Sequence, residues 1–521
     1  MNERAGMVFL VGAGPGAPDL IAIRGADALR RADIVIYDYL VSPELLKLAP
    51  PKAELIYAGK KGGGEKTIAQ AELNRMLIDH ARKGRVVVRL KGGDPFIFGR
   101  GGEEAEALAR AQVSFEVVPG ITSAIAAPAF AGIPLTHREH GSFVAFVTGH
   151  EDERKGAFSA IPWDELGAAA QSRGTIVILM ATARMRATLN RLSRAGLSGE
   201  TPAAAIQWAT TAAQRTVSAT LATLADACAR EGLKSPAVLV VGESAGLRDQ
   251  LQWVERTALF GRTIVVTRSP ASAPQFASEL RRLGAEVIQF PTIETAPPKN
   301  YALLDAAIAR IKSFDWIIFT SATGVESFIS RLRFLGRDIR SIGRASIAAI
   351  GPATAERLTH HGLEVAAMPD EYRAEAISDA IGIKRIRGKR FLIPRAEVAR
   401  EALPEILRAK GAREVQIAPA YRTIKPKGVQ VERMRELIAS HAIDLVTFTS
   451  SSTVKNFCGL IGAAARGLKA AAIGPITAEA ARRRGFEVVV TPAEYTISAL
   501  TAAIRGYCAK RARLTTKTER H

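Results

Sequence analysis

The fold is organised around residues 88–104, VRLKGGDPFIFGRGGEE. A β-rich run at 85–90 leads into Gly92, Gly93 and Asp94, and a second glycine cluster precedes an acidic helix start at Glu103. Glycines let the backbone take positive φ and approach a ligand closely, and an aspartate at a strand's carboxyl end can accept hydrogen bonds from hydroxyl or ammonium groups. The pattern predicts a ligand site, with two surface turns around a buried Phe-Ile-Phe insert as the alternative.

Length and composition indicate a multidomain globular protein. The 521 residues suggest about three or four compact units. Hydrophobic residues make up 47%, charged residues 23%, and no apolar run reaches the roughly 20 residues of a membrane span. The opening MNERAGMVFLVGAG contains an acid and enters a strand at once, so we expect no signal peptide, no membrane partner and a cytoplasmic location. Three distant cysteines, Cys228, Cys458 and Cys508, indicate neither a disulfide framework nor a metal site.

The net charge of +20, from 71 basic and 51 acidic residues, favours polyanionic partners. The basic residues are scattered through helix-like segments, aromatics are only 6%, and no nucleic-acid-binding motif occurs. We therefore expect no nucleic-acid partner and favour a small substrate with many carboxylates. The tail 509–521 is basic, and from Lys510 on it has no apolar pattern, so we expect it to be disordered.

Strand-like and helix-like runs alternate from the start, which predicts an α/β fold. One series covers about 1–135, and a second, which begins near Phe143, covers 136–250. These series predict two lobes, with the small-residue and proline-rich stretch 119–134 lining a cleft between them. A new β-run starts at Arg262, so we place a domain boundary near Arg256 and assign 251–260 to a linker.

The second half of the chain repeats itself. DWIIFTSATGVESF at 315–328 returns as DLVTFTSSSTVKNF, an offset of 129 residues from Asp315 to Asp444. IGPATAERLTHHGLEVAAMPDEY at 350–372 returns at an offset of 123 residues, and 261–268 is loosely matched at 388–395. Residues 261–508 are therefore predicted to form two similar α/β domains. In each copy a strand ends in Thr-Ser before a helix, which predicts either an anion site or a simple helix cap.

The glycines GAGPGA at 12–17 formally match the dinucleotide-binding pattern, with Asp33 and Asp38 near the usual distance for a ribose-binding acid. However, Pro15 has no N–H for a pyrophosphate, and Pro18 moves the expected helix start several residues on. We therefore predict a cofactor without phosphate that carries ribose, adenine and a charged amino-acid tail. The expected contacts are Gly14, Pro15, Gly93 and Asp94.

Asp38 ends the strand in VIYDYLVS, and Lys60 ends the next strand in IYAGKKGG. Because open α/β sheets bind ligands at the carboxyl ends of their strands, this pair can act as proton acceptor and donor, or form a surface salt bridge.

His137 and His140 lie three residues apart on an expected turn. With no third ligand in reach, we expect no metal there.

The first half contains GAGPGAPDLIAIRGADALRRADIVIYDYLVS, VVVRLKGGDPFIFGRGGEE, VVPGITSAIAAPAFAGIPLTHR and FVTGH. In these segments, from about Val8 to Trp253, it resembles the tetrapyrrole methylase family and, within it, the uroporphyrinogen-III C-methyltransferases. The resemblance implies two α/β lobes that hold S-adenosylmethionine, without a metal, in the cleft between them. Asp38 and Lys60 fall on proposed proton-handling positions, while Ala181 and Ala209 replace glycines common there. The implied cofactor-binding positions are Pro15, Gly92, Gly93, Asp94, Ile97, Thr122, Ser123, Met180 and Ala209.

The second half, from Arg256 to about Cys508, contains the Thr-Ser strand ends, IGPITA and a Tyr-x-Thr segment at Tyr421. In these features it resembles the uroporphyrinogen-III synthases. The resemblance implies two flavodoxin-like domains in which the first strand unit packs with the last segment. Tyr421 falls on a tyrosine thought to assist departure of the substrate hydroxyl. The implied substrate-binding positions are Thr320, Ser321, Thr449, Ser450 and Thr477.

Together the resemblances imply a fusion of two consecutive enzymes. The second half is expected to cyclise hydroxymethylbilane to uroporphyrinogen III, and the first to methylate that product at C2 and C7 to precorrin-2, which feeds sirohaem or cobalamin synthesis. We also expect a homodimer through the methylase half, and no dehydrogenase and ferrochelatase domain of the kind that precedes some methylases. The alternatives are a methylase of a later corrinoid intermediate and a non-enzymatic ligand-sensing or nucleic-acid-binding protein.

Overall fold

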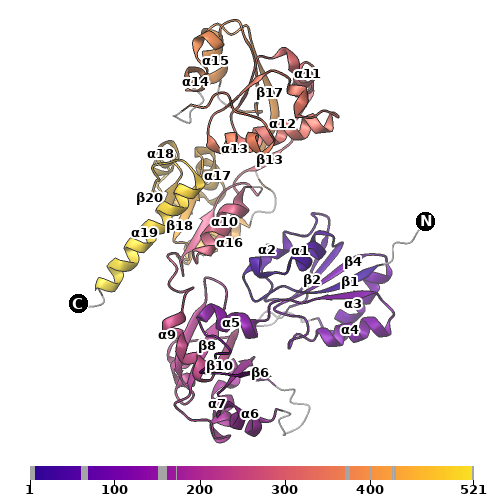
Figure 1. Cartoon of the computed structure of the whole chain (residues 1–521), viewed down its shortest axis with the longest axis vertical. Helices are drawn as coiled ribbons and strands as arrows, with labels where there is room; N and C mark the ends of the chain where they lie inside the picture. The colour runs from indigo at the N-terminus through magenta and orange to yellow at the C-terminus, as the bar shows by residue number, and fades with distance from the viewer. Residues whose placement is uncertain are drawn as a thin grey trace. The chain divides into compact units, whose positions relative to one another are not determined.

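The computed structural model describes residues 6–59, 68–150, 161–171, 173–270, 272–369, 376–398, 401–424, 426 and 430–518, with side chains through 510. It divides into two compact units (Figure 1). The first is Met1–Arg262 with Arg281–Glu286, and the second is Thr263–Leu280 with Val287–His521. The chain first passes from the first unit to the second after Arg262, and the exact domain bounds stay a prediction.

The first lobe of the first unit is a parallel sheet with helices on both faces. Its strands are β1 (Met7–Gly12), β2 (Ile34–Tyr37), β3 (Glu54–Tyr57), β4 (Val86–Lys91) and β5 (Phe115–Val118), in the order β3-β2-β4-β1-β5. Its helices are α1 (Ile23–Arg30), α2 (Pro43–Leu46), α3 (Gln70–Arg82) and α4 (Gly101–Arg110). Alternate residues of β1 enter opposite cores: Val11 packs with α1 and α2, and Leu10 with α3 and α4, on either side of the sheet in Figure 1.

The second lobe is a mixed sheet that follows a helix of small residues, α5 (Ser123–Ala131). Its strands are β6 (Phe143–Thr148), β7 (Gly174–Leu179), β8 (Pro202–Gln207), β9 (Arg215–Thr220) and β10 (Ala237–Val241), in the order β6-β7-β10-β8-β9. Strands β6 and β7 pair in parallel and the other neighbours antiparallel. Helix α5 covers one face, and α6 (Trp163–Gln171), α7 (Met185–Arg194) and α8 (Leu224–Arg230) cover the other.

The segment predicted as a linker, 251–260, packs within the first unit after α9 (Arg248–Leu251). The Trp253 ring lies 5.3 Å from the Phe130 ring, and its Nε1 donates to the Ala129 carbonyl at 3.0 Å. A Cβ on Gly132 would lie 2.5 Å from backbone atoms of this segment. Trp253 is therefore packed against the end of α5, where Gly132 allows the close approach of the backbone.

Two further sheets follow. One contains β11 (Thr263–Val266), β12 (Glu286–Gln289), β18 (Leu445–Phe448), β19 (Lys469–Ala472) and β20 (Glu487–Val490), in the order β12-β11-β18-β19-β20. The other contains β13 (Glu294–Ala296), β14 (Trp316–Phe319), β15 (Ser346–Ala349), β16 (Arg390–Ala396) and β17 (Glu414–Ile424), in the order β13-β17-β16-β14-β15. Because β11 pairs in parallel with β18, the start of this region packs with its end, as the synthase resemblance implied.

The sequence repeat occupies equivalent places in the two sheets. The run β14, α12 (Ala322–Phe334), β15 and α13 (Pro352–His360) corresponds to β18, α17 (Ser451–Ile461), β19 and α18 (Pro475–Arg482). Strand β16 flanks β14 as β11 flanks β18, which agrees with the loose match of 388–395 to 261–268. The remaining helices are α10 (Ala273–Arg282), α11 (Ala302–Ala309), α14 (Ile377–Ile381), α15 (Ala402–Ala409), α16 (Val431–Ala439) and α19 (Ile497–Thr518).

The expected disorder of the C-terminal tail is wrong for most of its length, because α19 continues to Thr518. Buried Leu500, Ile504 and Cys508 anchor the start of this helix, and the alanine-, arginine- and lysine-rich sequence beyond them favours continued helix.

Short 3-10 turns complete the described elements: η1 (Pro18–Leu20), η3 (Thr182–Arg184), η4 (Glu243–Leu247), η5 (Ile311–Ser313), η6 (Ile339–Ile342), η7 (Ile383–Arg385) and η8 (Gly462–Ala465). In the described part of the chain no helix has the length and apolar character to cross a membrane.

An aspartate just before an inner strand recurs in three of the sheets. Asp33, Asp315 and Asp444 accept backbone N–H groups of the neighbouring strand segment, from Val86 at 3.0 Å, Arg390 at 2.9 Å and Thr263 at 2.9 Å respectively. Each carboxylate therefore ties together the amino-terminal ends of two parallel strands. Asp33 lies at the edge opposite the ligand edge, so it does not serve as the ribose-binding acid that the dinucleotide pattern suggested.

Candidate active sites

Two glycine loops meet at the carboxyl edge of the first sheet. The Gly14 N–H donates to the Gly93 carbonyl at 3.2 Å, and the Gly93 N–H donates to the Gly14 carbonyl at 2.8 Å. Both residues have positive φ, +80° and +67°, which side chains with a Cβ rarely adopt. The loops after β1 and β4, singled out separately in the sequence, are therefore joined backbone to backbone.

Asp94 connects the same site to a third loop, the one after β5. Its Oδ1 accepts the Phe96 N–H at 2.8 Å, and its Oδ2 accepts the Gly120 N–H at 2.9 Å. A Cβ on Gly120 would lie 2.3 Å from the Gly93 carbonyl oxygen, so only glycine fits there. Asp94 thus shapes a backbone cradle in addition to presenting a carboxylate at the strand end.

The start of α5 completes this cradle. Thr122 caps the helix, its Oγ1 accepting the Ala124 N–H at 3.3 Å. The position that a Cβ on Gly93 would take lies 3.7 Å from Thr122 Cα and 3.8 Å from Ser123 N. Four predicted cofactor-binding residues are therefore brought together by backbone geometry: Gly93, Asp94, Thr122 and Ser123.

The second lobe contains two residues with a left-handed backbone that follow strands, Met180 and Thr210, and Thr210 contacts the first glycine loop. The Ala17 N–H donates to Thr210 Oγ1 at 3.0 Å, which joins the first glycine loop to the turn after β8. Met180, directly after β7, has a φ of +58° and an exposed fraction of 50%. A left-handed backbone at an exposed methionine is uncommon and is typical of functional sites. This strain gives physical support to the predicted role of Met180.

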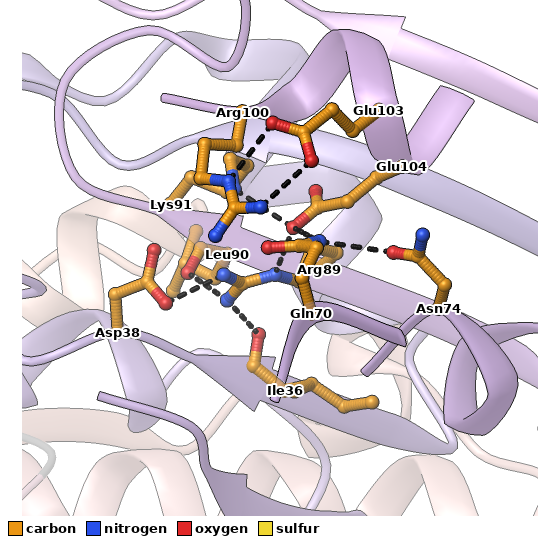
Figure 2. Close-up of polar contacts among 10 residues, drawn as sticks. All are labelled: Ile36, Asp38, Gln70, Asn74, Arg89, Leu90, Lys91, Arg100, Glu103 and Glu104. Carbon is orange, nitrogen blue, oxygen red and sulfur yellow. Dashed lines mark hydrogen bonds and ion pairs between the residues drawn. The ribbon is translucent and has the colours of Figure 1, made fainter. Parts of the chain in front are cut away.

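Asp38 is held by a buried arginine, Arg89 of β4 (Figure 2). Arg89 Nη2 donates to Asp38 Oδ1 at 2.6 Å, and Arg89 Nε donates to Glu104 Oε1 at 3.1 Å. Lys91 Nζ donates to the same Glu104 oxygen at 2.9 Å. Burial, reinforced by the charge of Arg89, lowers the pKa of Lys91 from its usual value, although Glu104 and Asp38 act in the opposite direction. Asp38 therefore belongs to a buried charge network.

Arg100 and Glu103 form a second charged pair beside this network (Figure 2). Arg100 Nε and Nη2 donate to the two oxygens of Glu103 at 2.9 and 2.7 Å. Hydrogen bonding to Arg100 holds the pKa of Glu103 below its usual range. Arg100 has a φ of +60°, and its side chain is 58% exposed, so the pair is oriented by the loop yet reachable from solvent.

In the second unit, Tyr421 of β17 lies against the strand-end serine of β14. The Tyr421 hydroxyl is 3.0 Å from Ser321 Oγ, and Ser321 also caps α12 by accepting the Gly324 N–H at 3.0 Å. In the other copy of the repeat, Ser450 caps α17 by accepting the Thr453 N–H at 3.3 Å. Both serines are therefore helix caps, and only the first is partnered by a tyrosine among the described contacts.

Comparison with known proteins separates the same two regions. The family model for Tetrapyrrole (Corrin/Porphyrin) Methylases matches residues 7–225, and that for Uroporphyrinogen-III synthase HemD matches residues 274–502. The Porphyrin biosynthesis protein HemD of Ruminiclostridium josui is 37% identical over 487 residues, which cover 93% of this chain and 95% of that protein. The chain belongs to the tetrapyrrole methylase family in its first half and to the uroporphyrinogen-III synthase family in its second.

The Uroporphyrinogen-III C-methyltransferase of Priestia megaterium is 48% identical over 238 residues, which cover 46% of this chain and 98% of that protein. A crystal structure of uroporphyrin-III C-methyl transferase from Thermus thermophilus, complexed with S-adenyl homocysteine, is 37% identical with a TM-score of 0.39 and covers 46% of this chain and 100% of that chain. The two family models and the relative that spans 93% of the chain show a bifunctional enzyme of tetrapyrrole biosynthesis, with a methylase half and a synthase half.

The predicted methylase residues fall on two sides of the site. Ile97, on the turn after Asp94, is 39% exposed, and a Cβ on Gly92 would lie 3.1 Å from Leu40 Cβ. Ala209 belongs to the second lobe, where its carbonyl oxygen would lie 3.2 Å from a Cβ on Gly16. Pro15 lies between Gly14 and Gly16 in the same loop. Lys60, predicted as the proton donor, lies outside the described residues.

The predicted substrate-binding residues of the synthase half differ in how exposed they are. Thr320 and Thr449 are half-buried at the ends of β14 and β18, whereas Thr477 is 6% exposed inside α18. Its counterpart in the first copy, Thr354 of α13, is also 6% exposed. A buried threonine in both copies indicates packing, so contact between Thr477 and a carboxylate stays a prediction.

Sequence reasoning missed Arg89, Lys91 and Glu104. The available signal was the alternation in VVVRLK, which directs Arg89 and Lys91 to one face of a strand whose other residues are apolar. Two cations on one buried face require an anion, and Glu104 lies in the first turns of the following helix.

The expectation that no third ligand lies near His137 and His140 is wrong, because a carboxylate oxygen of Glu139 lies within 4.8 Å of the histidine nitrogens. Glu139 is exposed and its N–H bonds His137 Nδ1, and the absence of a metal here stays a prediction.

Proposed function

We propose that the synthase half cyclises hydroxymethylbilane to uroporphyrinogen III and that the methylase half methylates this product at C2 and C7, giving precorrin-2 for sirohaem or cobalamin synthesis. The observation that carries the proposal is the joined pair of glycine loops with Asp38 held by Arg89 on the neighbouring strand. This arrangement combines a backbone cradle and a carboxylate at one sheet edge.

In the methylase half, S-adenosylmethionine supplies an electrophilic methyl group. The residues proposed to hold it are Pro15, Gly92, Gly93, Asp94, Ile97, Thr122, Ser123, Met180 and Ala209. Asp38 accepts the proton that the pyrrole ring loses as the new carbon–carbon bond forms, and Arg89 holds that carboxylate in place through a contact of 2.6 Å. Lys60 is proposed as the accompanying proton donor. No metal is needed for this step.

In the synthase half, loss of hydroxide from the substrate makes a reactive cation, so the protein mainly folds the chain for attack by the correct pyrrole carbon. The Tyr421 hydroxyl, oriented by Ser321, donates a hydrogen bond to the departing hydroxyl. Hydroxyl groups at strand and helix ends hold carboxylate arms of the substrate. The residues proposed for this are Thr320, Ser321, Thr449, Ser450 and Thr477.

The net charge of +20 attracts substrates that carry many carboxylates, so it requires no nucleic-acid partner. We also propose a cytoplasmic location and a homodimer through the methylase half. Retention on heparin at physiological salt with a steep salt dependence would favour a nucleic-acid-binding protein instead. Sedimentation of the full chain, compared with its synthase half alone, tests the dimer.

The decisive assay incubates the purified chain with hydroxymethylbilane, with and without S-adenosylmethionine. We expect uroporphyrinogen III alone without the cofactor, and a product heavier by two methyl groups with it. Formation of the type I isomer alone would contradict the synthase assignment. Methylation of a corrinoid but not of supplied uroporphyrinogen III would favour a methylase of a later intermediate.

A further inference from the structure

The carboxylate of Glu104 lies at the centre of the buried charge network and touches no predicted ligand position. Glu104 is 0% exposed, and Arg89 and Lys91 are each 3% exposed. Three donors converge on its Oε1: Arg89 Nε at 3.1 Å, Lys91 Nζ at 2.9 Å and Gln70 Nε2 at 3.4 Å. Removing such charges from water is costly, so the cluster has to be compensated by close pairing.

The two carboxylate oxygens of Glu104 are paired unequally. Two cations, Arg89 and Lys91, share one oxygen of one carboxylate, while the other oxygen, Glu104 Oε2, is buried without a hydrogen-bond partner in the described structure. Packing stability alone would be served by pairing both oxygens or by apolar residues of the same size. The second anion that balances the cluster is Asp38, whose side chain remains 30% exposed.

Arg89 is held in one orientation by contacts on every side of its guanidinium. Its Nε meets Glu104 and its Nη2 meets Asp38, while its Nη1 lies 3.4 Å from the carbonyl oxygens of Ile36 and Leu90 (Figure 2). Because the guanidinium is planar, fixing Nε at Glu104 fixes the direction in which Nη2 points. The position of Glu104 therefore determines where Arg89 Nη2 lies, and so where Asp38 Oδ1 is held.

We infer that Glu104 is a positioning residue for methylation: it orients Arg89, and Arg89 in turn fixes the carboxylate of Asp38 as proton acceptor. The inference rests on the role proposed above for Asp38. Holding Asp38 Oδ1 at 2.6 Å leaves Oδ2, on a partly exposed side chain, to receive the proton. Glu104 and Arg89 thus act through Asp38, and neither has to touch the cofactor or the substrate.

The test compares Glu104→Gln with Arg89→Lys and with the control Glu106→Gln, each assayed with supplied uroporphyrinogen III. Glu106 lies on the same helix, where its exposed carboxylate pairs with Arg110 at 2.6 Å. We expect Glu104→Gln and Arg89→Lys each to lower kcat by at least about tenfold, because proton transfer is sensitive to geometry. The KM and the calorimetric affinity for S-adenosylhomocysteine should stay within about twofold, and Glu106→Gln should change nothing.

Arg89→Lys keeps the buried charge balance, so it remains informative if Glu104→Gln fails to fold. A folded Glu104→Gln or Arg89→Lys with unchanged kcat would overturn the inference. A parallel loss of kcat and of S-adenosylhomocysteine affinity would also overturn it, since that pattern indicates a support of the whole fold. Asp38→Asn, measured alongside, distinguishes failure of the proposed role of Asp38 from failure of the inferred role of Glu104. If Asp38→Asn keeps full kcat, the proposed role of Asp38 fails, and the inference about Glu104 fails with it.

Discussion

Asp38 directly follows β2 and Tyr421 lies within β17, and their surroundings differ in charge. Asp38 contacts the buried guanidinium of Arg89 at 2.6 Å, and two more ionised side chains complete the cluster. Tyr421 contacts the neutral hydroxyl of Ser321 at 3.0 Å, and that serine is fixed by the start of α12. The first site holds a carboxylate through a charged partner, and the second holds a hydroxyl through a neutral one.

The difference follows from what each reaction requires. A base that takes a proton has to be held toward the substrate, and the buried guanidinium of Arg89 holds Asp38. A leaving hydroxide on an activated carbon departs readily, so an oriented hydroxyl is sufficient help. We therefore expect substitutions around Asp38 to be more costly than those around Tyr421.

The largest effect is expected for Asp38→Asn, which keeps the shape and removes the base. The rate of methylation of supplied uroporphyrinogen III should fall by about a hundredfold or more, the usual contribution of a positioned general base. Cyclisation of hydroxymethylbilane by the same variant should be unchanged. If methylation persists, the contrast between the two sites does not hold.

The next effect is expected for Asp94→Ala, which releases the Phe96 and Gly120 N–H groups and so opens the backbone cradle. The affinity for S-adenosylhomocysteine, measured by calorimetry, should weaken by at least about tenfold, or about 1.4 kcal/mol. Circular dichroism serves as the folding control. Unchanged affinity in a folded variant would remove Asp94 from the cofactor site.

A smaller effect is expected for Tyr421→Phe, which removes only the hydroxyl that meets Ser321. Formation of uroporphyrinogen III should slow by about tenfold or less, since a single neutral hydrogen bond contributes about 1 kcal/mol, and methylation should be untouched. Tyr301→Phe is the matched control, because the Tyr301 ring packs on Arg331 at 4.0 Å. A parallel loss of both activities in Tyr421→Phe would assign the residue to the scaffold.

The smallest effect concerns stability. Asp315→Asn should lower the free energy of unfolding of the synthase half by about 1 kcal/mol, because a charge-assisted hydrogen bond to the Arg390 N–H is weakened. Burial acts to raise the pKa of Asp315, but hydrogen bonds from Arg390 and Lys389 outweigh it, so the pKa lies below the usual value. This contribution is present above the unfolded pKa of about 4 and is lost as the pH falls through the folded pKa. Thermal unfolding at neutral and acidic pH should show the two proteins converging on acidification.

Local patterns predicted most of the fold. Alternating apolar residues located the strands, the Pro15 and Pro18 positions excluded a helix start at the first glycine loop, and the offsets from Asp315 to Asp444 located the repeat. The joining of Gly14 to Gly93 could only be expected in outline, because it depends on β1 and β4 being neighbours. The contact of Arg89 with Glu104, 15 residues apart, follows from how α4 packs on the sheet, and no single-segment pattern encodes that.

The central claim is that the two sites work independently, and it is tested most directly by separating them. The cut is made between Arg256 and Thr257, where the sequence places the domain boundary; Arg256 Nη2 bonds the Asp249 carbonyl at 2.8 Å on one side, and Leu259 bonds the Leu283 carbonyl at 2.9 Å on the other. Fragments 1–256 and 257–521 are expressed apart, and the rate of each on its own substrate is compared with that of the full chain. We predict that each fragment keeps its own activity, with reduced solubility where the cut exposes apolar side chains of residues 251–260. A fragment that is folded by circular dichroism yet inactive until the other is added would contradict the account.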